Sequence, residues 1–133
     1  MNRFRVLLVL LMAAGAVHVA SAMDRWAALS MLETGNDDNA VGSNGEVSRF
    51  QIRPQLWPGG NPQDMQFALS VAQEIMQDRV AAFQKAHNRP PTDFEFYVLW
   101  NAPVQADHPS KAVTDRAQRF ENLVRRTEQL ARH

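Results

Sequence analysis

Apolar residues recur three and four positions apart along much of this chain, and this spacing constrains the fold more than any other feature. It runs through residues 61–87, 92–101 and 110–131. Such spacing is typical of an α-helix that buries one face. The residues expected to face the interior are Leu69, Ala72, Met76, Val80 and Phe83, then Phe94, Tyr97, Val98 and Trp100, then Val113, Ala117, Phe120, Val124, Thr127 and Ala131. The sequence therefore predicts a mainly α domain.

Each of these stretches begins with residues that favour the start of a helix. Asn61 followed by Pro62 predicts a start there, because asparagine caps free backbone N–H groups and proline fits the first turn. Thr92 and Glu95 have the spacing of a capping box. Ser110 is a suitable N-cap for the last stretch. These signals support three separate helices.

A shorter apolar stretch, residues 24–34, predicts a first helix that ends at Gly35. The chain from there to Gly60 is polar and rich in turn-forming residues, which is typical of loops. Within it, residues 47–52 fit either a short strand or a helical turn, and periodicity cannot decide between them over so few positions. We therefore expect one compact domain of about five helices with at most a small β-hairpin.

The first 22 residues have the pattern of a secretory signal peptide. Arg3 and Arg5 precede an apolar run over residues 6–17, and the small residues Ala20 to Ala22 fit a cleavage site. The run is shorter than the roughly 20 residues that a membrane-spanning helix needs. We therefore assign residues 1–22 to a signal and 23–133 to the domain. A periplasmic or secreted protein without stable membrane insertion is expected, an uncleaved anchor being the alternative.

Composition narrows the classes of function. The 14 basic and 14 acidic residues give a net charge of zero, which argues against a nucleic-acid-binding protein. The chain has no cysteine, so it has neither a disulfide framework nor thiol nucleophiles and thiolate metal ligands. Its four histidines are scattered along the sequence. We therefore expect no metal and no other cofactor.

A carboxyl group at the end of the first helix is the leading candidate for chemistry. Glu33 follows a half-buried apolar run and precedes a polar loop. Burial penalises the charged form of a carboxyl, so we expect Glu33 to keep a proton near neutral pH while a cleft beyond the loop admits substrate. The alternative is that Glu33 is an ordinary solvated glutamate at the end of a helix.

Three short motifs occur in order along the domain. They are Glu33-Thr34, then Gly-Glu-Val-Ser-Arg-Phe-Gln over residues 45–51, then Leu-Trp-Asn-Ala-Pro over residues 99–103. Together they resemble the lysozyme-like catalytic domain of the soluble lytic transglycosylases, whose motifs are Glu-Ser, Gly-Ala-x-Gly-Leu-Met-Gln and Ala-Tyr-Asn-Ala-Gly. The resemblance extends from about Trp26 to the 110s. It implies a lysozyme-like fold and cleavage of the β-1,4 bond between N-acetylmuramic acid and N-acetylglucosamine in peptidoglycan.

The resemblance also implies roles for individual residues. Glu33 is the expected general acid, and then base, of the reaction. Gln51 lines the saccharide groove, and Asn101 reaches the acetamido group of the substrate or the reacting centre. The full set expected to bind substrate is Glu46, Ser48, Phe50, Gln51, Trp100 and Asn101.

Some positions differ from the family pattern. Trp100 stands where the family has a tyrosine that supports the catalytic acid, so we expect its indole N–H to replace the lost phenol. Ser48 stands in place of a glycine and Arg49 in place of a leucine, which affects the shape of the groove. The alternative for Trp100 is that its ring only packs in the core.

Three functions remain open from the sequence. The first is a lytic transglycosylase acting through Glu33 alone. The second is a hydrolytic lysozyme that adds a second carboxylate, for which Asp37, Asp38 and Glu46 are candidates and Glu46 is preferred. The third is an inactive module of the same fold that binds the cell wall or assembles with a secretion system. Peptidoglycan strands are the expected partner, and a secretion-system or cell-envelope protein is a further one.

Overall fold

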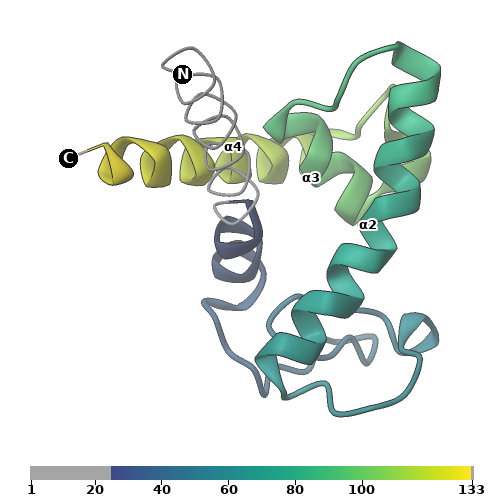
Figure 1. The fold of residues 1–133 in the computed structure, drawn as a ribbon, viewed down its shortest axis with the longest axis vertical. Helices are drawn as coiled ribbons and strands as arrows, with labels where there is room; N and C mark the ends of the chain where they lie inside the picture. The colour runs from purple at the N-terminus through teal and green to yellow at the C-terminus, as the bar shows by residue number, and fades with distance from the viewer. Residues whose placement is uncertain (1–24, 133) are drawn as a thin grey trace, which may run out of the picture.

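The computed structural model describes residues 25–132, and it is built almost entirely from helices (Figure 1). Residues 25–34 form the first helix, followed by α2 (Met65–His87), α3 (Asp93–Asn101) and α4 (Lys111–Ala131). Two short 3-10 helices, η1 (Pro54–Leu56) and η2 (Pro103–Gln105), lie in the connections. The predicted mainly α class is confirmed, with four α-helices in the described chain where about five were expected.

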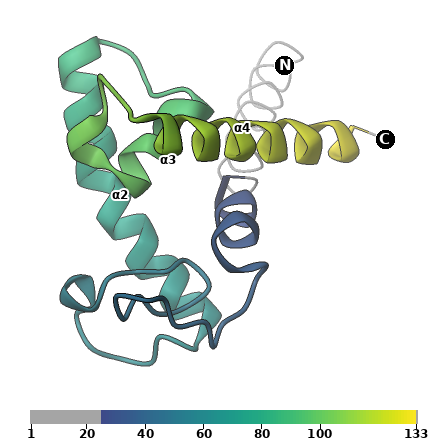
Figure 2. The same ribbon diagram turned by 180° about the vertical axis from the view of Figure 1, so that it is seen from behind.

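The helices are arranged around α3 at the centre of the molecule. The short helix α3 packs against both α2 and α4. Helix α2 runs along one side, and the loops of residues 35–64 gather around its first turns (Figure 2). Helix α4 crosses near the other end of the molecule, and its last turns extend beyond the body in both views. The first helix contacts α3, since the Trp26 ring meets the Phe96 ring edge-on at 5.5 Å.

The loop before α2 is folded back on itself without forming a sheet. Isolated antiparallel bridges join Val47 to Val41 and to Ile52, and the described residues contain no strand. The backbone of Val47 exchanges hydrogen bonds of 3.0 and 2.9 Å with that of Ile52. Residues 47–52, left open by the sequence, are thus a closed turn rather than a strand or a helix.

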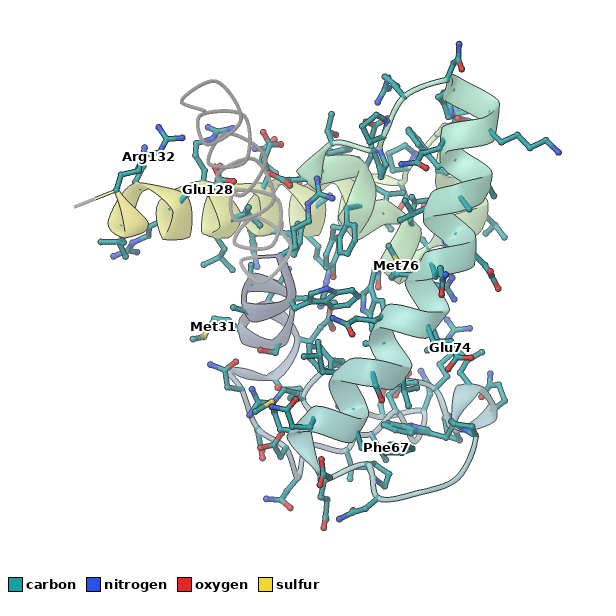
Figure 3. The ribbon with its side chains drawn as sticks, viewed as in Figure 1. Met31, Phe67, Glu74, Met76, Glu128 and Arg132 are labelled. Carbon is teal, nitrogen blue, oxygen red and sulfur yellow. The ribbon has the colours of Figure 1, made fainter. Side chains whose placement is uncertain are left out.

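The predicted buried face of α4 is confirmed from Val113 to Val124, and the predicted faces of α2 and α3 are confirmed in part. Leu69 and Val80 are only partly buried, and so are Phe94 and Trp100. The side chains of Thr127 and Ala131 lie outside what the structure describes. Figure 3 shows Met76 pointing from α2 toward the interior and Met31 pointing away from it. The buried residues of the three helices are Ala68, Val71, Ala72, Met76 and Phe83, then Phe96, Tyr97, Val98 and Leu99, then Val113, Ala117, Phe120 and Val124.

Two of the three predicted helix starts are confirmed, and one is wrong. Thr92 and Glu95 form the capping box, and Ser110 accepts a hydrogen bond from Val113 N. The long helix begins at Met65, not after Asn61. Its N-cap is Asp64, because the Asp64 carboxylate accepts from Phe67 N at 2.9 Å, while the Asn61 side chain closes a turn one step earlier.

None of the described helices is both long and apolar enough to cross a membrane. The predicted signal peptide, residues 1–22, falls outside the residues that the structure describes. The assignment of a signal peptide therefore stays a prediction.

Candidate active site

The end of the first helix is fixed in a way that places Glu33 beside the following loop. Gly35 has a φ of +66° and donates its N–H to Met31 O at 2.9 Å, which is a left-handed helix cap that glycine adopts without strain. The Thr34 hydroxyl donates to Arg49 O at 2.9 Å and accepts from Asp37 N at 3.1 Å. Thr34 therefore ties the helix end to both sides of the loop.

A groove of about 760 Å³ opens next to this helix end. Its walls come from the first helix, the loop of residues 42–56, the middle of α2, the end of α3, η2, and the first turns of α4. The predicted site residues that line it are Glu33, Glu46, Gln51, Trp100 and Asn101. The three sequence motifs are thus brought to one place, although they span about half of the chain.

Ser48 and Phe50, which were also expected to contact substrate, do not line the groove. They are 1% and 2% exposed. Ser48 has a φ of +74°, a conformation that favours glycine, and its hydroxyl accepts from Phe50 N at 3.2 Å. The Phe50 ring meets Trp26 edge-on at 6.1 Å. Both residues therefore hold the loop on the core, a supporting role rather than a contact with substrate.

Glu33 takes part in a closed set of hydrogen bonds with Tyr97 and Arg116. The Tyr97 hydroxyl donates to Glu33 Oε1 at 2.8 Å. Arg116 Nη2 donates to Glu33 Oε2 at 3.1 Å, and Arg116 Nε donates to the Tyr97 oxygen at 2.8 Å. The side chain of Glu33 is only 10% exposed. Both carboxyl oxygens are thereby held in fixed directions beside the groove.

The hydrogen bond to Glu33 comes from Tyr97, so the expectation that Trp100 supplies it is wrong. Tyr97 is fully buried, and this burial together with the charge of Glu33 raises its pKa well above the usual value, so it stays a donor. Tyr97 lies four positions before Asn101 on α3, hence on the same side of the helix. Trp100 instead lines the groove and meets Trp26 edge-on at 6.2 Å.

Three arginines of the groove were missed by the sequence analysis. Arg116 belongs to a basic stretch of α4 that is more often a solvated face, yet it is three residues after the inward-facing Val113. Arg79 reaches across from α2 and donates from Nη1 to the carbonyls of Leu99 and Trp100, both at 2.9 Å. Arg53 is exposed at the wall of the groove. Helical spacing is a usable signal for Arg116, but no sequence pattern predicted the other two.

Arg79 fixes the end of α3 from which Trp100 and Asn101 project. Its positive charge sits against the last carbonyls of that helix, where a cation is favoured by the helix dipole. Burial lowers the pKa of Arg79, and the nearby Arg53 adds to this. The arginine therefore serves as a C-terminal cap supplied by another helix.

Glu46 faces the groove as a second carboxylate. Hydrogen bonds from its own backbone N–H and from that of Asn44 lower its pKa, so it is ionised near neutral pH. Gly42 lies so close that an added Cβ would come within 2.6 Å of Gln51 Oε1 and even closer to a Glu46 carboxylate oxygen. The loop is braced outside the groove by Arg49, which pairs with both oxygens of Asp38 at 2.6 and 2.9 Å.

Among the described residues, no group of three or more potential metal ligands lies close together. Comparisons of the chain with models of protein families, with curated proteins and with solved structures give no match.

Proposed function

We propose that this protein is a peptidoglycan-cleaving glycosidase of the lytic transglycosylase type. The observation that carries the proposal is Glu33: its carboxyl is almost buried, held by a tyrosine, and lies in the wall of the groove that also contains Gln51 and Asn101. The order of the three motifs in the sequence supports the same assignment. Because peptidoglycan lies outside the cytoplasm, the proposal includes a periplasmic or secreted location.

In this mechanism one carboxyl group acts first as a general acid and then as a general base. Glu33 first donates a proton to the glycosidic oxygen as the bond from C1 of N-acetylmuramic acid breaks, which releases the N-acetylglucosamine end as an alcohol. By the family resemblance, the acetamido oxygen of the same sugar stabilises the positive charge at C1. Its C6 hydroxyl then bonds to C1 and returns its proton to Glu33, which leaves a 1,6-anhydro ring. No water is consumed.

The other groove residues have roles that fit this scheme. Asn101, exposed at the end of α3, offers an amide to the acetamido group of the substrate. Gln51 is held by bonds from its side-chain nitrogen to Ala40 O and Ser48 O at 3.4 and 3.2 Å. Those bonds engage its nitrogen as a donor, so its carbonyl oxygen is the atom left to accept from a sugar hydroxyl. The Trp100 ring supplies an apolar surface for a sugar face.

The direct test is to incubate the purified protein, and its Glu33→Gln variant, with peptidoglycan. The wild type is expected to release soluble muropeptides, and the variant to release them at least 100-fold more slowly, since general acid catalysis contributes about 10²–10⁴ in rate. Glu74→Gln is the matched control, because Glu74 is exposed on α2 and does not line the groove. Equal release by the wild type and Glu33→Gln would leave only a wall-binding or secretion-assembly module.

A hydrolytic lysozyme is the second candidate, and the ionised Glu46 in the same groove favours it. In that reaction a charged carboxylate activates water or stabilises the cation while Glu33 acts as the acid. Glu46→Gln separates the two reactions. A lysozyme would lose most of its activity, whereas a transglycosylase would keep the 1,6-anhydro products with a modest change in rate.

A further inference from the structure

Arg116 uses only part of its hydrogen-bonding capacity within the protein. Its Nε donates to the Tyr97 oxygen at 2.8 Å, and its Nη2 donates to Glu33 Oε2 at 3.1 Å. The other N–H groups, those of Nη1 and the second one of Nη2, have no hydrogen-bond partner among the described residues. They form the end-on edge of the guanidinium plane. A planar pair of donors of this kind matches the two oxygens of a carboxylate.

This end-on edge can be reached from the groove. The side chain of Arg116 is 44% exposed, compared with 10% for Glu33, and both residues line the groove. Since Nε and Nη2 are directed at Tyr97 and Glu33, the end-on edge is the part of the guanidinium left to meet a ligand. Tyr97 is completely buried and holds the opposite edge in place. A ligand can therefore bind Arg116 without breaking its contacts with the protein.

The other two arginines of the groove are placed differently. Arg79 is partly buried and is engaged with the carbonyls at the end of α3. Arg53 is exposed on the loop side, where it lies close enough to Glu46 to lower the pKa of that carboxyl. Among the described residues, Arg116 is the groove arginine that is bonded to Glu33. A group bound by Arg116 therefore lies beside the carboxyl that the proposed reaction uses.

We propose that the end-on edge of Arg116 binds a carboxylate of the glycan and thereby selects the sugar that lies beside Glu33. This inference rests on the proposed glycosidase function and names the group of the substrate that is recognised. N-acetylmuramic acid carries a lactyl carboxylate, and where this group is joined to a stem peptide the peptide supplies carboxylates of its own. N-acetylglucosamine carries none. Arg116 is thus a specificity-determining residue that places N-acetylmuramic acid at the bond to be cleaved.

The first experiment measures binding and needs no turnover. The Arg116 side-chain nitrogens are followed by NMR while the protein is titrated with N-acetylmuramic acid, with the same sugar bearing a short peptide, or with N-acetylglucosamine. We expect the wild type to bind a carboxylate-bearing sugar about tenfold or more tightly than N-acetylglucosamine, since a hydrogen bond between charged groups contributes about that factor. A preference for only one of the two charged sugars assigns the lactyl or the peptide carboxylate. Equal affinity for all three sugars would overturn the inference.

Variants identify the arginine that is responsible. Arg116→Gln should lose the preference, and Arg116→Lys should keep only part of it, because an ammonium retains the charge but not the planar fork. Arg119→Gln is the matched control, since Arg119 is an exposed arginine on the same helix that does not line the groove. Arg53→Gln tests the other exposed arginine of the groove. A preference that survives in Arg116→Gln, or that is lost instead in Arg53→Gln, would overturn the inference.

Cleavage measurements separate recognition from the support that Arg116 gives to Glu33. The substrate is the glycan that carries the recognised carboxylate, before and after its carboxylates are converted to neutral methylamides. In the wild type, this conversion should lower kcat/KM about tenfold or more, mainly through a higher KM. Arg116→Gln should cleave both forms with nearly equal kcat/KM, even where the lost bond to Glu33 lowers its kcat. A residue that only supported Glu33 would leave the wild-type ratio unchanged, and that result would overturn the inference.

The carboxylate site and the glycosidase function fail in different ways. Equal cleavage of the charged and the neutral glycan by the wild type would overturn the carboxylate site and leave the glycosidase proposal intact. No cleavage of any glycan by the wild type would defeat the glycosidase proposal, and the inference with it.

Discussion

At the scale of single residues, the site depends on the one phenol that the chain contains. Tyr97 both donates to Glu33 and accepts from Arg116, so one hydroxyl sets the direction of the acid and the position of the guanidinium. Tyr97 is 0% exposed, so the position of its hydroxyl is fixed by the core that surrounds the ring. The orientation of the Glu33 carboxyl therefore depends on how α3 packs in the core.

Tyr97→Phe should separate orientation from stability. We expect the free energy of unfolding to fall by about 1 kcal/mol, because the lost hydrogen bonds involve groups that are partly buried. The kcat for peptidoglycan should fall about tenfold or more, since each 1.36 kcal/mol of transition-state stabilisation is a factor of ten. The measurements are urea unfolding and muropeptide release.

Phe120→Leu is the control for this variant. Phe120 is buried against the Tyr97 ring at 5.4 Å, so its truncation lowers stability while the hydroxyl remains. It should retain its kcat per folded molecule. If Tyr97→Phe lost no more activity than Phe120→Leu, the hydroxyl would have no part in the site.

A second residue-scale prediction concerns Gly42, whose Cα hydrogen faces the groove carboxylate. Gly42→Ala should displace the side chains of Glu46 and Gln51, because the new Cβ would lie within 2.6 Å of Gln51 Oε1. We expect KM to rise with a small change in melting temperature. Gly35→Ala is the contrast: it has a φ of +66° and nothing within 4 Å of the new Cβ, so it should lower stability by about 1 kcal/mol through backbone strain. A KM unaffected by Gly42→Ala would show that this wall of the groove does not contact substrate.

At the scale of elements, α3 carries the site and is held at both ends. Its N-terminus has the capping box of Thr92 and Glu95, and its C-terminus is bound by Arg79 from α2. Each end of this nine-residue helix thereby has partners for two backbone groups: the N–H groups of Thr92 and Glu95, and the carbonyls of Leu99 and Trp100. The position of Asn101, the last residue of α3, depends on these contacts.

Arg79→Met should loosen the end of α3. The variant removes one charged donor atom that is shared between two carbonyls, and a hydrogen bond involving a charged group contributes about 1.5–3 kcal/mol. We expect a loss of unfolding free energy within that range and a lower kcat/KM, with Arg79→Lys intermediate. Arg125→Gln breaks an exposed ion pair with Glu121 and should change stability by about 0.5 kcal/mol or less. Equal effects of the Arg79 and Arg125 variants would contradict the role of Arg79 as a cap.

The ion pair at the start of α3 predicts how the stability of the fold changes at low pH. The Arg89 guanidinium, bonded to Glu95 at 2.8 and 3.0 Å, lowers the pKa of Glu95 from 4.5 to about 2. A lowered pKa stabilises the fold above the unfolded value, and that stability is lost as the pH falls from about 4.5 to about 2. Glu95→Gln keeps the capping box but not the ion pair.

The stability difference between the wild type and Glu95→Gln should therefore be nearly constant from about pH 7 to about pH 5 and should be mostly lost at about pH 2. Because Arg89 is half exposed, the difference should not exceed about 1 kcal/mol. Urea unfolding at several pH values measures it. A difference that persisted unchanged to pH 2 would mean that the ion pair is not its source.

At the scale of the whole molecule, local patterns predicted the elements, and long-range contacts decided the site. The helical class, the capping box and the inner face of α4 follow from spacing within one segment. The bond between Arg116 and Glu33 joins positions 83 residues apart, and no periodicity records which side chains meet across such a distance. The N-cap of α2 was misplaced by three residues because Asn61, Pro62 and Asp64 are all suitable start signals and only tertiary packing selects among them.

The motifs predicted the location of the groove better than the role of each residue in it. Glu33, Gln51 and Asn101 line it as expected, but Ser48 and Phe50 are buried beneath it. The sequence could not show which side chains of residues 47–52 face the groove. Positive φ at Ser48 and Gln51 turns the chain sharply, so the side chains do not alternate between two faces as they would in a strand. The assignment of Trp100 as the residue that supports the acid was wrong because Tyr97, one turn earlier on α3, donates the hydrogen bond to Glu33.

The most direct test of the account is a peptidoglycan digest in water enriched in ¹⁸O, analysed by mass spectrometry, with the wild type and Glu33→Gln side by side. The account predicts 1,6-anhydro muropeptides without solvent ¹⁸O from the wild type, and at least 100-fold less product from the variant. The same products at the same rate from Glu33→Gln would contradict it.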